Sequence, residues 1–172
     1  ESARKTWASY IARFRGALHP VTIGIIGKYT TVRDSYASII HAIEHAGAYA
    51  GAKVQLEWVD SADLSDANVA DRLRALHGVI VPGGFGVRGV DGKIACVKYV
   101  REHGIPYLGI CYGMQIAVIE FARNVCGLTH ACSTEIEPDC PQPVIDLLPE
   151  QKKIEGLGGN MRLGGFDLVL SP

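Results

Sequence analysis

Hydrophobic positions along the chain alternate between two spacings, one typical of buried strands and one typical of amphipathic helices. The pattern predicts strands over residues 21–27, 53–59, 78–81 and 106–110, and helices over 36–50, 69–76, 94–102 and 114–126. Residues 61–68 show no clear period. Repeated strand–helix units predict an α/β fold, a doubly wound and mostly parallel sheet flanked by helices. Ligands should then bind at the carboxyl ends of the strands.

The two ends of the chain differ from this pattern. Residues 4–18 place Trp7, Ile11, Phe14 and Leu18 on one helical stripe among basic residues. A basic amphipathic helix can contact a membrane or a partner, but packing against the following domain is the commoner outcome, and we expect it here. Beyond residue 127 prolines interrupt the pattern, and a strand-like run returns at 166–170. We therefore predict a lead-in linker helix over 1–20 and one domain over 21–172.

The termini suggest a piece of a longer protein, because the chain begins with Glu1 and stops directly after an apolar run. We expect the domain to be truncated at its carboxyl end.

Composition narrows the classes of function. The 172 residues are 48% hydrophobic and 20% charged, with a formal net charge of −1, so nothing indicates binding to nucleic acid or to an anionic membrane. No apolar run is as long as a membrane span. The five cysteines are odd in number and, like the six histidines, lack metal-ligand spacing. We expect no metal site, a reducing compartment and a cytoplasmic protein with a small-molecule substrate.

Cys111 is the leading candidate for chemistry. It follows the predicted strand 106–110 and precedes the helical pattern that begins near Met114. Free amides and the helix dipole at a helix N-terminus favour thiolate over thiol. Gly109 and Gly113 on either side leave room for a strained turn that mounts a nucleophile. The alternative is that Cys111 is an inert, buried small hydrophobe.

A second glycine-rich turn, Pro82-Gly83-Gly84-Phe85-Gly86, follows the strand predicted at 78–81. One N–H from this loop and the N–H of Tyr112 would together stabilise an oxyanion, an effect worth about 3–4 kcal/mol per donor. This arrangement suits acyl transfer. A plain tight turn or a phosphate-binding loop is the alternative, although no Gly-x-x-x-x-Gly-Lys-Ser/Thr motif occurs.

Several motifs together resemble the class I (triad-type) glutamine amidotransferases, which implies a flavodoxin-like fold. The Cys-x-Gly-x-Gln core, Cys111 to Gln115, is shared by that whole family. Other motifs resemble one branch of it, which makes CTP from UTP. These are Gly27-Lys28-Tyr29, Asp60-Ser61, Arg88-Gly89-Val90 with Gly92-Lys93, and Met161-Arg162-Leu163-Gly164.

The resemblance implies a role for each matching residue. Cys111 would attack the side-chain amide of L-glutamine, form a γ-glutamyl thioester and release ammonia. The N–H groups of Gly84 and Tyr112 would form the oxyanion hole. Substrate contacts would come from Gly84, Tyr112, Gly113, Met114, Gln115 and Glu135, with the Glu135 carboxylate on the α-ammonium. A lid linked with GTP activation would include Gly158, Gly159, Met161, Arg162, Leu163 and Gly164.

The resemblance also implies partners. Ammonia would pass to an amidoligase domain of the same polypeptide, which uses ATP, Mg²⁺ and UTP, with GTP as activator and no cofactor in the present domain. The full-length enzyme would be a homo-oligomer. Two alternatives stay open: another class I amidotransferase, from guanine nucleotide or carbamoyl phosphate synthesis, or an inactive glutamine-binding or assembly fragment.

The chain departs from the family at three points. Tyr112 stands where family members carry Leu, and its larger side chain could alter the pocket wall. The stretch between Pro149 and Gly158 is short for the family. The family's arginine-histidine and His-Pro-Glu motifs, which carry the general base, would lie beyond Pro172. We do not assign this role to any histidine present, namely His19, His41, His45, His77, His103 or His130.

Overall fold

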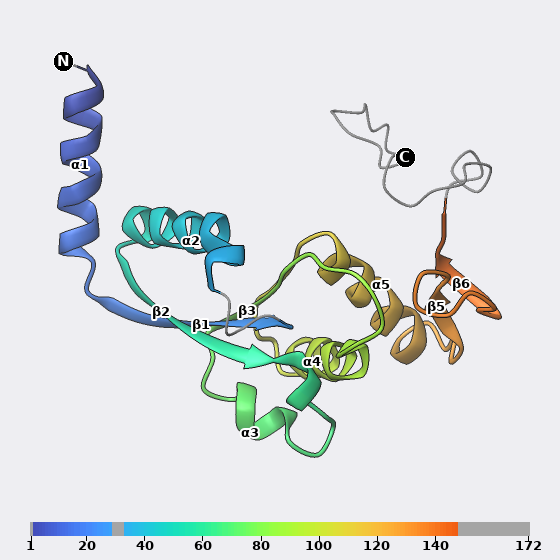
Figure 1. Ribbon diagram of the computed structural model, residues 1–172. Helices are drawn as coiled ribbons and strands as arrows, with labels where there is room; N and C mark the ends of the chain where they lie inside the picture. The colour runs from blue at the N-terminus through green and yellow to red at the C-terminus, as the bar shows by residue number, and fades with distance from the viewer. Residues whose placement is uncertain (1, 29–32, 148–172) are drawn as a thin grey trace, which may run out of the picture.

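The computed structural model describes residues 2–28 and 33–147. Its main sheet holds four parallel strands in the order β2-β1-β3-β4 (Figure 1). The strands are β1 (His19–Gly27), β2 (Ala52–Asp60), β3 (Gly78–Val81) and β4 (Tyr107–Gly109). All four were predicted, and the parallel α/β class is confirmed. The lid at 158–164 and the strand expected at 166–170 lie outside the described residues.

Helices cover both faces of the sheet. In Figure 1 helix α2 (Ala37–Ala50), which follows the 3-10 turn η1 (Arg33–Tyr36), lies on one face. The turn η2 (Ser61–Asp63), α3 (Val69–Leu73) and α4 (Val90–Glu102) lie on the other. Helix α5 (Tyr112–Asn124) packs against α4 and β4. The sheet is therefore doubly wound, as predicted.

Helix α4 begins four residues before the predicted start at residue 94. Gly89 precedes it with φ 73°, a left-handed conformation that glycine adopts without a steric penalty. Gly92 then packs so closely on η2 that an added Cβ would overlap the carbonyl oxygen of Ser61. The apolar periodicity did not show this first turn, because its fit depends on glycines rather than on apolar side chains.

The core lies between β1, β3 and the helices α3 and α4. Its fully buried members include Ile26, Val59, Leu73, Val79 and Val81. The last four residues of β1 are all buried, which is expected of a central parallel strand covered on both faces. Burying such side chains stabilises the fold by about 1.5–3 kcal/mol each, and this core holds the carboxyl ends of β1 and β3 together.

The strand order creates a switch point, because the chain moves from β1 outward to β2 and then returns to the other side of β1 as β3. In open α/β sheets, ligands bind at the carboxyl edge near such a point. The residues that leave this edge are Lys28 after β1, Pro82 after β3 and Ile110 after β4. The glycine loop and Cys111 are therefore neighbours in space.

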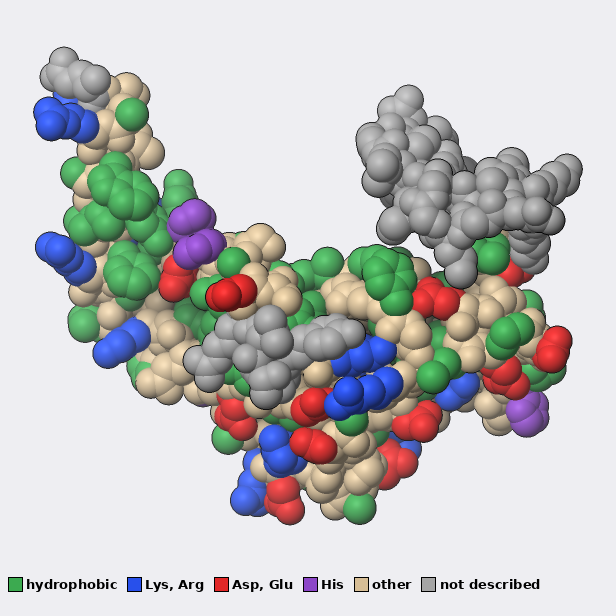
Figure 2. Space-filling view, viewed as in Figure 1, with side chains coloured by type: hydrophobic (Ala, Val, Ile, Leu, Met, Phe, Trp, Pro, Cys, Tyr) green, Lys and Arg blue, Asp and Glu red, His purple; other side chains and the backbone are tan. Residues whose placement is uncertain are grey.

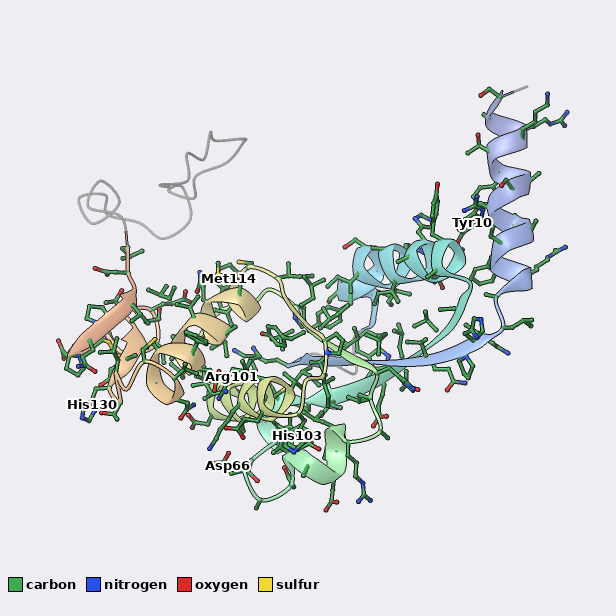
Figure 3. The ribbon with its side chains drawn as sticks, turned by 180° about the vertical axis from the view of Figure 1, so that it is seen from behind. Tyr10, Asp66, Arg101, His103, Met114 and His130 are labelled. Carbon is green, nitrogen blue, oxygen red and sulfur yellow. A yellow bond between two sulfur atoms is a disulfide. The ribbon has the colours of Figure 1, made fainter. Side chains whose placement is uncertain are left out.

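A helix, α1 (Ser2–Gly16), is present where the pattern predicted one, but the expectation for its apolar stripe is wrong. Trp7 is 62% exposed and Phe14 50% exposed, so these side chains do not pack against the domain. A neighbouring face of the helix contacts α2 instead: Tyr10 meets His45 edge-on, and the Arg13 guanidinium lies 4.7 Å from the Tyr49 ring centroid. The helix extends away from the sheet, and hydrophobic side chains are visible on its surface (Figures 2 and 3).

A second sheet was not predicted. It pairs β5 (Ala131–Ser133) with β6 (Gln142–Ile145) in parallel, beyond α5. Cys132 and Cys140 form a disulfide across the intervening loop, whereas Cys96, Cys111 and Cys126 are free. The sequence interpretation, based on a reducing compartment, did not anticipate this pair. The equally short β3 and β4 lie in continuous apolar runs, whereas β5 and β6 lie in a stretch interrupted by prolines, where no such run marks a strand.

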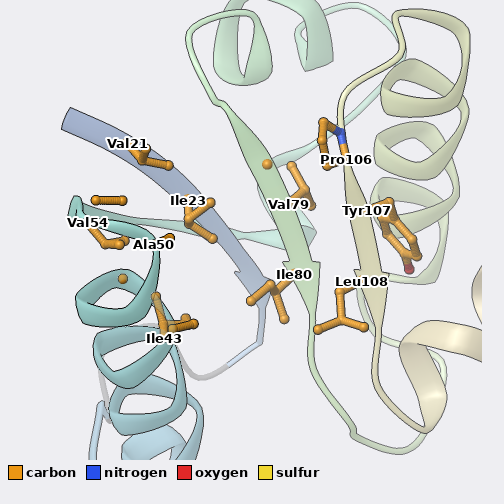
Figure 4. Close-up of a pocket in the computed structure, with 14 residues that line it drawn as sticks. Val21, Ile23, Ile43, Ala50, Val54, Val79, Ile80, Pro106, Tyr107 and Leu108 are labelled. Carbon is orange, nitrogen blue, oxygen red and sulfur yellow. The ribbon is translucent and has the colours of Figure 1, made fainter. Parts of the chain in front are cut away.

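An apolar groove crosses the face of the sheet beside α2 (Figure 4). Its lining includes Val21, Ile43, Ile80 and Leu108, and no predicted site residue takes part. Its lining is almost entirely aliphatic and contains no nucleophile, unlike the carboxyl edge of the strands, where Cys111 lies. Across residues 2–28 and 33–147, the helices are too short or too polar to cross a membrane.

Candidate active site

Cys111 sits in the turn between β4 and α5 with φ 52° and ψ −106°. Among the described residues it is the one non-glycine residue with positive φ. Such strain is retained where surrounding structure imposes it, commonly at functional sites. The cysteine is exposed and its thiol is free. These facts argue against the inert buried cysteine and match the predicted nucleophile mounted on a sharp turn.

The flanking glycines make this turn possible. An added Cβ at Gly109 would lie 2.6 Å from the Gly113 carbonyl carbon and the Met114 nitrogen. An added Cβ at Gly113 would overlap the carbonyl oxygen of Val81, at the end of β3. Side chains at either position would push α5 away from the sheet. The Gly-x-Cys-x-Gly pattern is therefore required by packing.

The glycine loop 82–86 lies against the cysteine. An added Cβ on Gly83 would be 3.5 Å from the Cys111 Cβ, whereas one on Gly84 would meet nothing within 4 Å. Open space therefore lies beside Gly84. The structure places Gly83, the neighbour of the predicted oxyanion donor Gly84, against Cys111, and the other predicted donor, Tyr112, directly follows Cys111 in the chain.

Glu135 joins the site through the backbone of the same loop. The N–H of Gly86 donates to Glu135 Oε1 at 3.1 Å, although the two residues are 49 positions apart. Glu135 follows β5, and its own N–H donates to the hydroxyl of the buried Ser133 at 3.2 Å. The carboxylate predicted from the family motif is therefore held at the glycine loop.

Gln115 and Met114 lie in the first turn of α5. The side-chain oxygen Oε1 of Gln115 is buried without a hydrogen-bond partner within the described part of the chain. A buried unpaired acceptor costs about 1–3 kcal/mol, so an additional donor would be stabilising. Met114 lies with Val118 and Phe121 along the exposed apolar side of α5 (Figure 3).

The Tyr112 side chain turns into the core and is 1% exposed, so it does not alter the pocket wall. It packs with Val90, Val97 and Ile116, and its hydroxyl donates to the carbonyl of Gly86 at 2.7 Å. Burial, together with the nearby Glu135 charge, raises the pKa of the Tyr112 phenol to about 12. It therefore remains a neutral donor at neutral pH.

Two lysines that the sequence analysis left without a role lie beside the site. The Lys28 ammonium donates to the carbonyls of Phe85 and Gly86. Lys93 is 2% exposed, and its ammonium lies 4.9 Å from the Tyr112 ring centroid. Burial and the charge of Lys28 lower the Lys93 pKa to about 8, against an opposing effect of Asp60. The sequence feature that could have marked Lys28 as a site residue is its position directly after a buried strand.

The histidines lie elsewhere. His77 precedes β3 and accepts from the backbone N–H of Thr22, and His103 follows α4 and stacks on Tyr99. These two positions belong to the amino edge of the sheet, opposite Cys111. In Figure 3, His130 lies beyond α5. Within the described ranges no three His, Cys, Asp or Glu side chains form a metal-binding group.

Comparison with known proteins places this site in a class. The family model for glutamine amidotransferase class-I matches residues 31–169. The chain therefore belongs to the class I glutamine amidotransferases, the family whose core motif runs from Cys111 to Gln115.

Individual relatives in this family share one name, CTP synthase. The chain is 51% identical over 172 residues to a protein of Archaeoglobus fulgidus named CTP synthase, covering all of this chain and 32% of that protein. It is 50% identical over 166 residues to the CTP synthase of Moorella thermoacetica, covering 96% of this chain and 31% of the relative. The chain thus spans about a third of the length of the relatives it matches.

A solved structure agrees with these relatives. The structure described as the glutaminase domain of Trypanosoma brucei CTPS with bound acivicin has a TM-score of 0.71 and 37% sequence identity. The match covers 76% of this chain and 51% of that chain. The shared fold includes the parallel sheet on which Cys111 is mounted.

Proposed function

We propose that this chain is the glutaminase part of a CTP synthase. It would hydrolyse L-glutamine to glutamate and ammonia through Cys111. The observation that carries the proposal is the exposed thiol of Cys111, held at positive φ at the N-terminus of α5 with the glycine loop beside it. The 49–52% identity to proteins named CTP synthase supports the choice within the family.

The proposed reaction is an acyl transfer. The Cys111 thiolate attacks the side-chain carbonyl carbon of glutamine, and the carbonyl electrons move onto oxygen. The N–H groups of Gly84 and Tyr112 stabilise this oxyanion. The carbon–nitrogen bond then breaks, nitrogen takes up a proton and leaves as ammonia, and a γ-glutamyl thioester remains. Water cleaves the thioester, giving glutamate and the free thiol. The proton donor would come from chain beyond the described residues.

Two polar groups would hold the amino-acid end of the substrate. The Glu135 carboxylate suits the α-ammonium by charge, and the Gly86 N–H fixes its direction. The buried Gln115 Oε1 offers a second acceptor beside the first turn of α5. Backbone at Gly113 and Met114 borders the same turn.

In the longer protein, ammonia would pass to an amidoligase domain. That domain would phosphorylate UTP with ATP and Mg²⁺ and aminate it to CTP, with GTP as activator, in a homo-oligomer in the cytoplasm. The cytoplasm keeps thiols reduced, so the Cys132–Cys140 disulfide would open there.

The first test is covalent labelling by acivicin, followed by peptide mass spectrometry. We expect an adduct on Cys111 that competes with L-glutamine. Cys126, which is also free and exposed, is the internal control and should stay unlabelled. No adduct on Cys111, or equal labelling of both cysteines, would refute an activated thiolate at this turn.

The alternative is a glutamine-binding fragment without turnover, favoured by the absence of a histidine contact at Cys111 within the described residues. Ammonia release measured beside labelling separates the two. An adduct without ammonia release from the 172-residue chain, but with release from the longer protein, supports a base supplied from outside these residues.

A further inference from the structure

The phenol of Tyr112 connects the helix that carries the nucleophile to the loop that carries the oxyanion donor. Tyr112 directly follows Cys111 and begins α5, whereas its hydroxyl donates to the Gly86 carbonyl at 2.7 Å. Tyr112 is 1% exposed and the bond is partly buried, which limits competition from water. The side chain thus spans the interval between the two elements on either side of the thiol.

Gly86 links Tyr112 to two further residues of the site. Its carbonyl accepts from Tyr112 and, at 3.4 Å, from the Lys28 ammonium. Its N–H donates to Glu135 Oε1 at 3.1 Å. With φ 74°, Gly86 adopts a left-handed conformation in which these three contacts converge on one residue. A shift of its carbonyl would therefore move both Glu135 and the loop that contains Gly84.

The hydroxyl, rather than the bulk of the ring, makes this link specific. The ring packs with Val90, Val97 and Ile116 and covers the Lys93 ammonium, contacts that a phenylalanine would keep. Leucine, the family's usual residue here, would fill part of the space and donate no hydrogen bond. The Gly86 carbonyl would then depend on Lys28, a longer and more exposed donor.

We propose that the Tyr112 side chain is a positioning residue, which holds the glycine loop and Glu135 in register with Cys111 for the binding and cleavage of glutamine. This inference rests on the proposed function, because it explains how the residues of that same glutaminase site are held relative to one another. Its effect on catalysis is indirect, through the Gly84 N–H and the Glu135 carboxylate.

The test is Tyr112→Phe in the longer protein, with ammonia release measured against glutamine concentration. Loss of one buried hydrogen bond corresponds to about a 5-fold fall in kcat/KM. We expect KM to rise because the Glu135 carboxylate is held less firmly. We expect kcat to fall because the Gly84 N–H is also held less firmly. Tyr112→Leu should lower kcat/KM further, and reversion of Phe to Tyr should restore both kcat and KM.

Tyr107→Phe is the matched control. Its hydroxyl also makes a partly buried 2.7 Å bond to a backbone carbonyl, that of Gly113, which lies on α5 rather than on the glycine loop. It should lower thermal stability about as much as Tyr112→Phe but raise the KM for glutamine much less, because the contact between Gly86 and Glu135 is kept. An equal rise in KM in both variants would overturn the proposal, since it would reflect general loosening.

Amide hydrogen exchange tests the same link without catalysis. In the 172-residue chain, Tyr112→Phe should increase exchange at the amides of residues 83–86, and Tyr107→Phe should not. Unchanged exchange there would overturn the proposal whatever the activity. If the unsubstituted protein neither takes up acivicin at Cys111 nor releases ammonia, the proposed function fails, while the exchange result still decides the role of Tyr112.

Discussion

Lys93 is the most unusual single residue next to the site, since lysine is rarely fully buried. Its ammonium faces the Tyr112 ring, the Lys28 ammonium and the Asp60 carboxylate. The folded-state pKa of about 8 lies below the ordinary value of 10.5, so folding disfavours the charged form. This stability cost is fully present below about pH 8 and is relieved as pH rises toward 10.5.

Lys93→Met should therefore stabilise the protein at pH 7, by about 1–2 kcal/mol once the lost contact with the ring is subtracted. The advantage should shrink at pH 10, where unsubstituted Lys93 is largely neutral. Urea unfolding at the two pH values measures this difference. Lys98→Met, which removes a lysine from the same helix, is the control variant. An advantage of equal size at both pH values would contradict the assigned cause.

At the scale of residues, sequence reasoning identified Cys111 and not the contacts that surround it. The cysteine was predictable because a strand, a turn and a helix are local and the required glycines lie two positions away. The bonds from Gly86 to Glu135 and to Tyr112 join positions 49 and 26 apart. No local period reports such a bond, which depends on how β3, α5 and β5 pack together.

At the scale of elements, the loop between β5 and β6 carries Glu135 and is closed by the Cys132–Cys140 disulfide. A crosslink over eight residues restricts the unfolded chain, with an expected contribution of about 2–3 kcal/mol. Arg123 reinforces the segment, because its Nε donates to the Ala131 carbonyl at 2.6 Å. The disulfide thus affects how firmly the Glu135 carboxylate is held.

Cys140→Ser should lower the unfolding free energy of the oxidised protein by about 2 kcal/mol. Urea denaturation with and without dithiothreitol measures this, and the reductant should remove the difference between variant and unsubstituted protein. Cys126→Ser is the matched control, because Cys126 is free and exposed. Identical curves for Cys140→Ser and the unsubstituted protein under oxidising conditions would show that the bond does not form in solution.

Most elements were predictable because each is either a continuous apolar run, as in β3 and β4, or a helix with an amphipathic period. The first turn of α4 and the short strands β5 and β6 were not, for they depend on glycine contacts and on pairing with distant segments. Helix α1 shows the converse. Its pattern predicted the helix correctly, but the packing of Trp7 and Phe14 was wrong, since a stripe does not specify what covers it.

At the scale of the whole molecule, helices α4 and α5 are joined by an ion pair between the buried Glu120 carboxylate and the partly exposed Arg101 guanidinium. The Arg101 guanidinium donates to the Glu120 carboxylate at 2.7, 3.0 and 3.2 Å, and Asn124 donates to the same carboxylate at 3.1 Å. Bidentate pairing of this kind fixes one helix against the other. Cys111, at the start of α5, is thereby held relative to the sheet.

The proposed separation of ammonia release and CTP formation in the longer protein leads to a prediction at the same scale. Cys111→Ala should abolish ammonia release from glutamine, because no thiol remains to form the thioester, yet leave CTP formation from added ammonia near its unsubstituted rate. Both activities are measured on one preparation. A parallel loss of both would contradict the assignment of two separate half-reactions.

The sequence alone determined the parallel α/β architecture, the strained turn at Cys111 and the family, because each depends on the local spacing of apolar residues or on a short motif. Only the tertiary structure decided that Tyr112 turns inward, that Lys93 is buried and that Glu135 reaches the glycine loop. These outcomes depend on strand order and on packing between distant segments. At the switch point between β1 and β3, such packing brings the candidate site together.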